Sequence, residues 1–335
     1  MTNARRRPLL TIEDIRAAAE RIVGRVVRTP LIPFAAAEAG RPLWLKPESL
    51  QPTGAFKLRG AFNAILQRLD DARSHGVVTH SSGNHARAVA WVARELGLRA
   101  VIVIPDAAPA VKVDAVRRLG AEVVIVAPEE RDTRAFELAA EHGYVMIPPY
   151  DDAAVVAGQG TVGLEIATDL TDIAAVLVPV SGGGLIGGVA TAVKALSPTT
   201  RVIGVEPELA ADAAESFRTG ERVSWTTEQT YRTIADGLRT TSVGEIPWGQ
   251  IQKYVDDVIT VGEDEIRDGV RRLAADARLV IEPSGAVPIA AYLHRAGQLG
   301  ADGNVVAVLS GGNIALDMLA GILAPAGQVS GPWLG

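Results

Sequence analysis

Residues 175–188 read AVLVPVSGGGLIGG, an apolar run followed at once by glycines. Ala175 to Val180 has the length and the β-branched content of a buried strand. Ser181 to Gly184 forms a tight glycine turn, and we expect the next helix to run from Gly188 to Leu196. A strand, a glycine turn and a helix in this order are typical of an α/β fold.

The glycine turn is suited to an anion, because bare backbone N–H groups at a helix N-terminus attract negative charge. Gly182, Gly184 and Gly187 match the pattern G-x-G-x-x-G, and Glu206 follows at the end of the next strand. A dinucleotide site, a site for another phosphate-bearing ligand and a purely structural turn all agree with this pattern.

The rest of the chain alternates in the same way, which predicts α/β architecture with largely parallel sheets. Helical patterns occupy 86–96, 112–119 and 263–275, and Thr11 is expected to cap a helix that ends at Gly24. We expect strands at 77–78, 100–104, 122–126, 144–147, 175–179, 201–205, 258–261 and 305–309.

A length of 335 residues favours two domains. Proline-rich spots at Gln51-Pro52 and Pro148-Pro149 are the best candidates for crossings between them. We therefore expect residues 52–148 to form a small inserted domain, and 1–51 plus 149–335 to form a large one. The cleft between them would be the natural ligand site.

Charge and hydropathy exclude several partners. The net charge of −6 argues against nucleic acid. The basic cluster Arg5 to Arg7 is not followed by the apolar region of a secretory signal. The uncharged stretch between Asp172 and Lys194 contains Pro179 and five glycines, so a soluble strand and helix explain it better than a membrane span. The protein is expected to be cytoplasmic.

The chain has no cysteine and only five lysines, at positions 46, 57, 112, 194 and 253. Thiolate chemistry and iron–sulfur clusters are therefore excluded. Lys57 is the unusual lysine, because it lies between Phe56 and Leu58 at the start of a helical pattern. Desolvation lowers the pKa of a lysine, as a Schiff-base amine or a general base requires. The alternative is a lysine that extends its charged end from a helix start into solvent.

A second polar motif, THSSGNHA, occupies residues 79–86 between a predicted strand and a predicted helix. Its small side chains and backbone amides at a helix N-terminus suit a carboxylate. His85 taken alone is more typical of a packed or capping histidine than of a catalyst.

Eight motifs in fixed order cover nearly the whole chain: SLQPTGAFKLRGA at 49–61, SSGNHA at 81–86, AGQGT at 157–161, SGGGLIGG at 181–188, GVEP at 204–207, TIADGL at 233–238, IEPSGA at 281–286 and SGGN at 310–313. In this order the sequence resembles the fold type II pyridoxal-phosphate (PLP) enzymes, in their serine/threonine dehydratase and serine racemase branch. The resemblance implies a fold like that of the tryptophan synthase β-subunit, with two open, mostly parallel sheets flanked by helices.

The resemblance also assigns roles to residues. It implies that Lys57 carries the cofactor covalently and removes the Cα proton of the substrate, and that Ser82 on the opposite face can return a proton. The implied cofactor-binding residues are Phe56, Lys57, Asn84, Gly182, Gly183, Gly184, Leu185 and Ser310. The implied substrate-binding residues are Ser81, Ser82, Gly83, Asn84, His85 and Arg131.

The implied activity converts a β-hydroxy amino acid, such as L-serine or L-threonine, to a 2-oxo acid and ammonia in a homodimer. Serine racemisation is the alternative. The segment Pro148 to Asp152 departs from the pattern His-Pro-Phe-Asp of many relatives, so 3-hydroxyaspartate or phenylserine also stay open as substrates.

The resemblance further implies a cation site made by Glu206, Ala210 and Asp212, with oxygen ligands that suit Mg²⁺, Ca²⁺ or Mn²⁺. An exposed acidic turn is the alternative. Two other classes of protein stay open on the residues alone: a nicotinamide-dependent oxidoreductase, and a binding protein without a cofactor.

Overall fold

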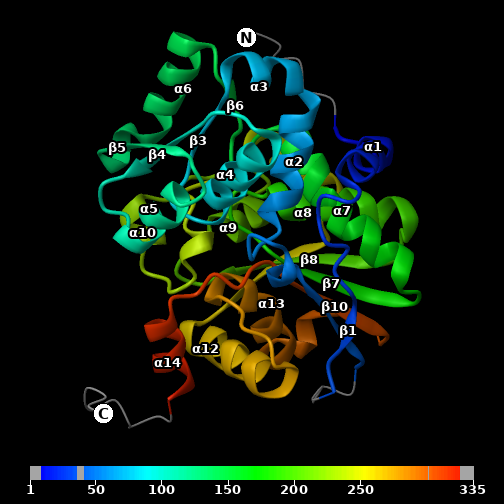
Figure 1. The fold of residues 1–335 in the computed structure, drawn as a ribbon. Helices are drawn as coiled ribbons and strands as arrows, with labels where there is room; N and C mark the ends of the chain where they lie inside the picture. The colour runs from blue at the N-terminus through cyan, green and yellow to red at the C-terminus, as the bar shows by residue number, and fades with distance from the viewer. Residues whose placement is uncertain (1–8, 36–40, 301, 325–335) are drawn as a thin grey trace.

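The computed structural model describes residues 9–35, 41–300 and 302–324, and the basic cluster Arg5 to Arg7 lies outside them. Two sheets of mostly parallel strands are flanked by helices, as Figure 1 shows. The predicted α/β class is confirmed.

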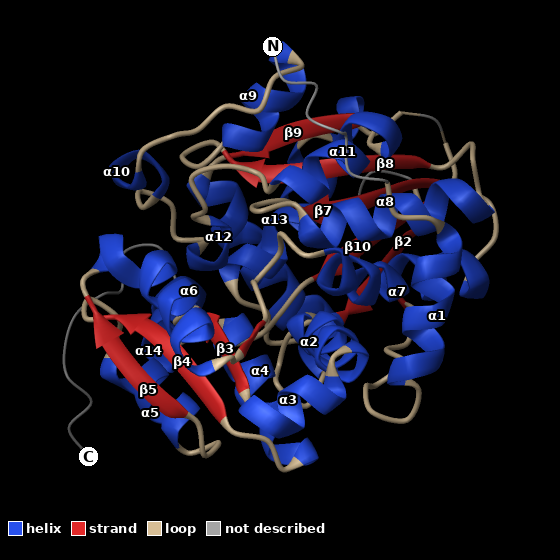
Figure 2. Ribbon diagram, turned by 90° about the horizontal axis from the view of Figure 1, so that it is seen from above, coloured by secondary structure: helices blue, strands red, loops and turns tan. Residues whose placement is uncertain are grey.

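The larger sheet has six strands in the order β1-β2-β10-β7-β8-β9. Figure 2 shows the part of this order from β2 to β9. All neighbours are parallel except the β1–β2 pair. The strands are β1 (Ile32–Pro33), β2 (Leu43–Pro47), β7 (Ile173–Pro179), β8 (Arg201–Pro207), β9 (Asp257–Val261) and β10 (Asn304–Leu309).

The smaller sheet has four parallel strands in the order β5-β4-β3-β6. They are β3 (Val77–His80), β4 (Ala100–Pro105), β5 (Glu122–Val126) and β6 (Val145–Met146). All of its strands come from one continuous part of the chain, between strands of the larger sheet.

The helices that surround the sheets include the predicted first one, where Thr11 forms a capping box with Asp14. They are α1 (Ile12–Ile22), α2 (Lys57–Gln67), α3 (Leu69–His75), α4 (Asn84–Leu96), α5 (Ala110–Arg117), α6 (Arg131–His142), α7 (Ala153–Asp169), α8 (Gly184–Leu196), α9 (Asp212–Thr219), α10 (Thr227–Thr230), α11 (Glu245–Tyr254), α12 (Glu263–Arg272), α13 (Pro283–His294) and α14 (Leu316–Leu323).

The helix after the glycine turn begins earlier than the sequence pattern predicts. It starts at Gly184 rather than Gly188, so the prediction of its first residue was wrong. Gly183, the last residue before the helix, takes a left-handed conformation with φ of +85°, which glycine adopts without steric cost. The glycines from 184 onward are therefore helical.

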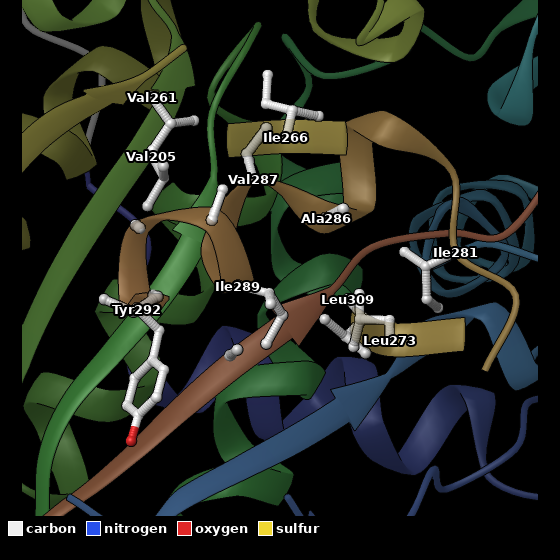
Figure 3. Packing of buried hydrophobic residues seen from close by; sticks show 14 of the residues in the cluster. Val205, Val261, Ile266, Leu273, Ile281, Ala286, Val287, Ile289, Tyr292 and Leu309 are labelled. Carbon is white, nitrogen blue, oxygen red and sulfur yellow. The ribbon is translucent and has the colours of Figure 1, made fainter. Parts of the chain in front are cut away.

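The core of the large sheet is built around α13, which is almost completely buried. Figure 3 shows Val287 and Ile289 of this helix among strand residues such as Val205, Val261 and Leu309. Tyr292 at the end of α13 is fully buried and donates its hydroxyl to the carbonyl of Arg41. Strands buried on both faces explain the continuous apolar runs in the sequence.

A buried ionic cluster fixes the start of α2. Arg59 is fully buried and donates to Glu48 Oε2 at 2.7 Å and to Glu165 Oε1 at 2.6 Å. Lys46 of β2, also fully buried, donates to Glu165 Oε2 at 2.6 Å. Both cations therefore have carboxylate partners, as buried charges require. The cluster joins β2, α2 and α7, and its Arg59 lies two residues after Lys57 in the sequence.

Within residues 9–35, 41–300 and 302–324, no helix combines the length and the apolar content needed to cross a membrane.

Candidate active site

Lys57 is the first residue of α2, and its amine points toward the segment that follows β6. Its Nζ donates a hydrogen bond of 2.6 Å to the carbonyl of Pro149 and lies 5.1 Å from the centre of the Phe56 ring. Burial lowers the pKa of Lys57 to about 8. About a tenth of the amine is therefore unprotonated at pH 7, far more than for an ordinary lysine, and the neutral form is the one that a nucleophile or a base requires.

The glycine turn between β7 and α8 is buried and places backbone amides at the N-terminus of α8. The first N–H groups of a helix have no intrahelical acceptor, and those of Gly184 and Leu185 open α8. A Cβ at Gly183 would lie 2.8 Å from Pro247 Cβ, so a side chain there is excluded by space as well as by φ. A phosphate group fits such a turn.

Tyr150 and Asp151 brace this turn. A Cβ at Gly182 would lie 2.3 Å from the Tyr150 ring, which therefore covers the glycine. Asp151 accepts hydrogen bonds from the N–H groups of Glu245 and Ile246 at the start of α11. The N–H of Gly244 in turn donates to the carbonyl of Gly182 at 3.1 Å.

The serine loop, residues Ser81–Gly83, joins β3 to α4. Ser81 Oγ accepts from the N–H of Gly83 at 3.2 Å, which bends the chain sharply before α4. His85 is buried, with Nε2 2.8 Å from the carbonyl of Ile147. Burial and the nearby Lys57 lower the pKa of His85 to about 3. The imidazole is therefore neutral and supplies no positive charge for a substrate carboxylate, which leaves that role to backbone N–H groups and hydroxyls.

The loop after β10 meets both the lysine and the serine loop. The carbonyl of Ser310 accepts from the N–H of Phe56 at 3.0 Å, and Ala55 forms a β-bridge with Gly311. Asn84 donates through Nδ2 to Glu282 Oε1 at 2.7 Å. Lys57, Asn84 and Ser310, which lie far apart in the sequence, therefore come from segments that touch one another.

Arg131, the predicted contact for a carboxylate, begins α6 and donates to Asp132 at 2.7 Å. The same carboxylate lies 2.9 Å from His80 Nδ1. Burial opposes the ionisation of Asp132, but these two partners together lower its pKa. Burial raises the pKa of Tyr150, and the Asp132 carboxylate is the second cause of this shift. The Arg131–Asp132 pair is therefore close enough to act electrostatically on Tyr150, which covers the glycine turn.

Glu206 at the end of β8 and Asp212 at the start of α9 form a buried carboxylate pair. One oxygen of Glu206 accepts from the N–H of Ala214 at 2.8 Å, whereas its second oxygen and both side-chain oxygens of Asp212 have no hydrogen-bond partner. Burial and Asp212 raise the pKa of Glu206, and burial raises that of Asp212 to about 7. Two buried carboxylates with free oxygens fit a divalent cation, the chemistry predicted from the sequence.

Among the described residues, no group of three or more His, Cys, Asp or Glu side chains is arranged to hold a metal ion. A cation beside Glu206 and Asp212 would therefore need main-chain and water oxygens as further ligands. Ala210, the third residue predicted for this site, lies between Glu206 and Asp212 in the sequence and is buried in the structure.

Residue-level reasoning on the sequence missed two neighbours of the predicted site, Glu282 and Asn313, and gave Tyr150 only as part of the divergent segment Pro148 to Asp152. Glu282 and Asn313 belong to the motifs IEPSGA and SGGN, so the signal was present, but nothing local connects either residue with Asn84. Burial raises the pKa of Glu282 to about 7. A buried carboxyl group with a raised pKa beside Asn84 is typical of a functional site.

Comparison with known proteins agrees with this geometry. The family described as "Pyridoxal-phosphate dependent enzyme" matches residues 22–311. The catabolic L-threonine dehydratase TdcB of Escherichia coli is 40% identical over 318 residues, which cover 93% of this chain and 96% of the relative. The L-threo-3-hydroxyaspartate ammonia-lyase of Saccharomyces cerevisiae is 39% identical over 326 residues, 96% of this chain and 98% of the relative.

Among solved structures, maize serine racemase superposes with a TM-score of 0.88 at 39% identity, covering 93% of this chain and 96% of the other. The fold and the sequence therefore define an enzyme of the PLP-dependent class. The chain belongs to the fold type II PLP enzymes, where its close homologues are serine racemases and threonine dehydratases.

Proposed function

We propose that the protein is an ammonia-lyase that converts a β-hydroxy amino acid, such as L-serine or L-threonine, to a 2-oxo acid and ammonia. The observation that carries the proposal is the Lys57 amine, with its pKa lowered by burial, on a segment joined to the loops of Asn84 and Ser310. The similarity to a dehydratase and to an ammonia-lyase over more than nine-tenths of the chain supports it.

In this proposal Lys57 is the covalent attachment point of PLP. The backbone amides of Gly182, Gly183, Gly184 and Leu185 would hold its phosphate, Phe56 would pack beside its ring, Asn84 would donate to its 3′-oxygen and Ser310 would face its pyridine nitrogen. When bound, PLP supplies an electron-withdrawing ring that stabilises negative charge at the Cα of the substrate.

The chain's own groups then bind the substrate and move protons. The serine loop, together with the backbone of Asn84 and His85, binds the substrate carboxylate, and Arg131 is its second contact. Once the amine of the substrate has displaced it from the cofactor, the free Lys57 amine would accept the Cα proton, a step that typically contributes 10²- to 10⁴-fold. The β-hydroxyl would take up the proton that Lys57 has accepted and leave as water. The released unsaturated amine would then take up one water to give the 2-oxo acid and ammonia.

Racemisation of serine is the second candidate, and the hydroxyl of Ser82 favours it. Ser82 lies in the bent loop before α4 and is partly exposed. On the face opposite Lys57 this hydroxyl would return a proton to Cα with inversion. The similarity to maize serine racemase is consistent with this activity.

We also propose that Glu206, Asp212 and the carbonyl of Ala210 hold Mg²⁺, Ca²⁺ or Mn²⁺. The free oxygens of the two carboxylates support this proposal. We further propose that residues 52–148 form a small domain and that residues 1–51 and 149–335 form a large one. We also propose that the protein is a homodimer located in the cytoplasm.

A substrate panel tests the proposed activity. The L- and D-forms of serine, threonine, 3-hydroxyaspartate and phenylserine are assayed in parallel for 2-oxo acid formation and for loss of chirality. We expect 2-oxo acid from at least one L-substrate, with none from the Lys57→Ala variant. Failure of serine, threonine and 3-hydroxyaspartate together would contradict the activity while leaving the cofactor assignment intact.

A further inference from the structure

The side-chain amide of Asn84 is held at both ends. Its Nδ2 donates to Glu282 Oε1 at 2.7 Å, and its Oδ1 accepts from Asn313 Nδ2 at 2.7 Å. Asn84 opens α4, Glu282 precedes α13, and Asn313 follows β10. The orientation of this amide is therefore set by three segments of the chain together.

The hydrogen bonds from Arg87 through Asn313 and Asn84 to Glu282 form a series, which we call the amide chain. Its first donor is Arg87, one turn along α4 from Asn84. Arg87 Nη1 donates to Asn313 Oδ1 at 2.6 Å. A guanidinium has donors and no acceptor, so the oxygen of the Asn313 amide must face it. The Asn313 nitrogen then faces the other way, where it donates to the carbonyl of Thr53 at 2.9 Å and to Asn84.

The far end of the chain is an acceptor. Glu282 is buried and accepts from Asn84 Nδ2 through one oxygen and from the N–H of Asn313, at 3.1 Å, through the other. With the Arg87 guanidinium, an obligate donor, at one end and the accepting oxygens of Glu282 at the other, each amide between them has one favourable orientation. An asparagine amide without such neighbours can exchange the positions of its oxygen and nitrogen by a half-turn.

This polarity decides what Asn84 offers to a ligand. An amide nitrogen carries two N–H groups, and Glu282 uses one of those on Asn84, which leaves the second free. A reversed amide would present its carbonyl oxygen instead. An ionised oxygen on the ligand is bound by a donor and repelled by an acceptor.

We propose that Arg87 is a positioning residue which, through Asn313, fixes the Asn84 amide with its N–H toward the 3′-oxygen of PLP. The inference rests on the proposed function, because that function assigns Asn84 to this oxygen. Arg87 acts here through two amides and has no contact of its own with the cofactor.

The test uses the enzyme reconstituted with PLP and measures two properties other than activity: the visible absorption band of the bound cofactor with its pH titration, and the dissociation constant of PLP. Arg87→Met keeps the aliphatic stem and removes the donor. Arg87→Lys restores an obligate donor. Arg94→Met is the matched control, because Arg94 lies on the same helix but stacks on Trp91, 4.4 Å from the ring centre.

We expect Arg87→Met to shift the absorption band or its pH titration and to raise the dissociation constant roughly ten-fold, the effect of losing one hydrogen bond to a charged group. Arg87→Lys should recover most of both properties, and Arg94→Met should match the wild type. A wild-type spectrum and affinity in Arg87→Met would overturn the inference.

Asn313→Asp keeps the proposal testable if Arg87→Met does not fold. This variant replaces the donor facing Asn84 by an acceptor at constant size, and we expect the same spectral change from it. An unchanged spectrum would overturn the inference on its own. A wild-type protein that shows no cofactor band at all would instead contradict the proposed function, so the two failures are distinguishable.

Discussion

Lys57 and Pro149 are joined by a hydrogen bond of 2.6 Å from the lysine amine to the main-chain oxygen. Lys57 begins α2, whereas Pro149 follows the last strand of the smaller sheet, at the predicted return to the large domain. The contact joins the lysine amine to the segment by which the chain leaves the smaller sheet.

This setting predicts the reactivity of the amine in cofactor-free protein. Burial lowers the pKa of Lys57 from 10.5 to about 8, so the reactive neutral form increases with pH up to about 9 and changes little above it. Reductive methylation followed residue by residue by mass spectrometry measures this, with the exposed Lys253 as reference. A rate at Lys57 that keeps rising ten-fold per pH unit beyond pH 9 would contradict the prediction.

Ser82→Ala separates the two candidate activities. Elimination needs the Lys57 base and departure of the hydroxyl, whereas inversion also needs a proton donor on the opposite face. We expect the variant to form 2-oxo acid at a rate within a few-fold of wild type and to lose racemisation by about 10²-fold or more. Chiral chromatography of residual serine measures the second rate, and a variant that racemises normally would exclude Ser82 from this role.

The buried carboxylates Glu206 and Asp212 predict stabilisation by a divalent cation. Binding to the folded state alone adds about 2.7 kcal/mol at a concentration 100 times the dissociation constant. Thermal unfolding with EDTA, Mg²⁺, Ca²⁺ or Mn²⁺ should therefore show a higher Tm with at least one cation. The increase should be absent in Glu206→Gln and present in Glu221→Gln, which alters an exposed carboxylate. Equal Tm values with EDTA and with all three cations would reject the site.

The ionic cluster around Arg59 predicts a large loss of stability on removal of the cation. Arg59→Met leaves Glu48 and Glu165 with less compensation in a buried place, which typically costs about 3–5 kcal/mol. The comparison variant Arg28→Met breaks a partly exposed pair with Asp169 and should cost at most about 1 kcal/mol. Urea unfolding of both variants measures the two losses in the free energy of unfolding. Equal midpoints would contradict the prediction that removal of the buried cation costs more than removal of the exposed one.

Much of the fold could be predicted because buried parallel strands leave continuous apolar runs. The two strands that were not predicted explain the limit. β2 contains Lys46, a charge that reads as surface until Glu165 is brought to it by the fold. β1 has only two residues, too few for a pattern.

Helix α7 shows a second limit. It is buried on nearly all sides and carries Gly158 and Gly163, so it lacks the amphipathic period by which a helix is found in a sequence. These glycines permit close packing. A Cβ at Gly158 would lie 2.7 Å from the carbonyl of Arg59, and one at Gly163 would lie 2.6 Å from that of Val189.

The candidate site was predictable where chemistry is local, as with Lys57 and the glycine turn. The chain from Arg87 through Asn313 to Asn84 was not, because residues more than 200 positions apart in sequence form it. Only the assembled fold shows that a guanidinium determines the orientation of an amide in the site.

The most direct test of the account is reduction of the purified protein with borohydride, followed by digestion and mass spectrometry. We predict a yellow protein whose visible band disappears on reduction, with a phosphopyridoxyl group on the peptide that contains Lys57 and no band in Lys57→Ala. A colourless protein after incubation with PLP, or a label confined to Lys46, Lys112, Lys194 or Lys253, would contradict the assignment of Lys57 as the residue that carries the cofactor.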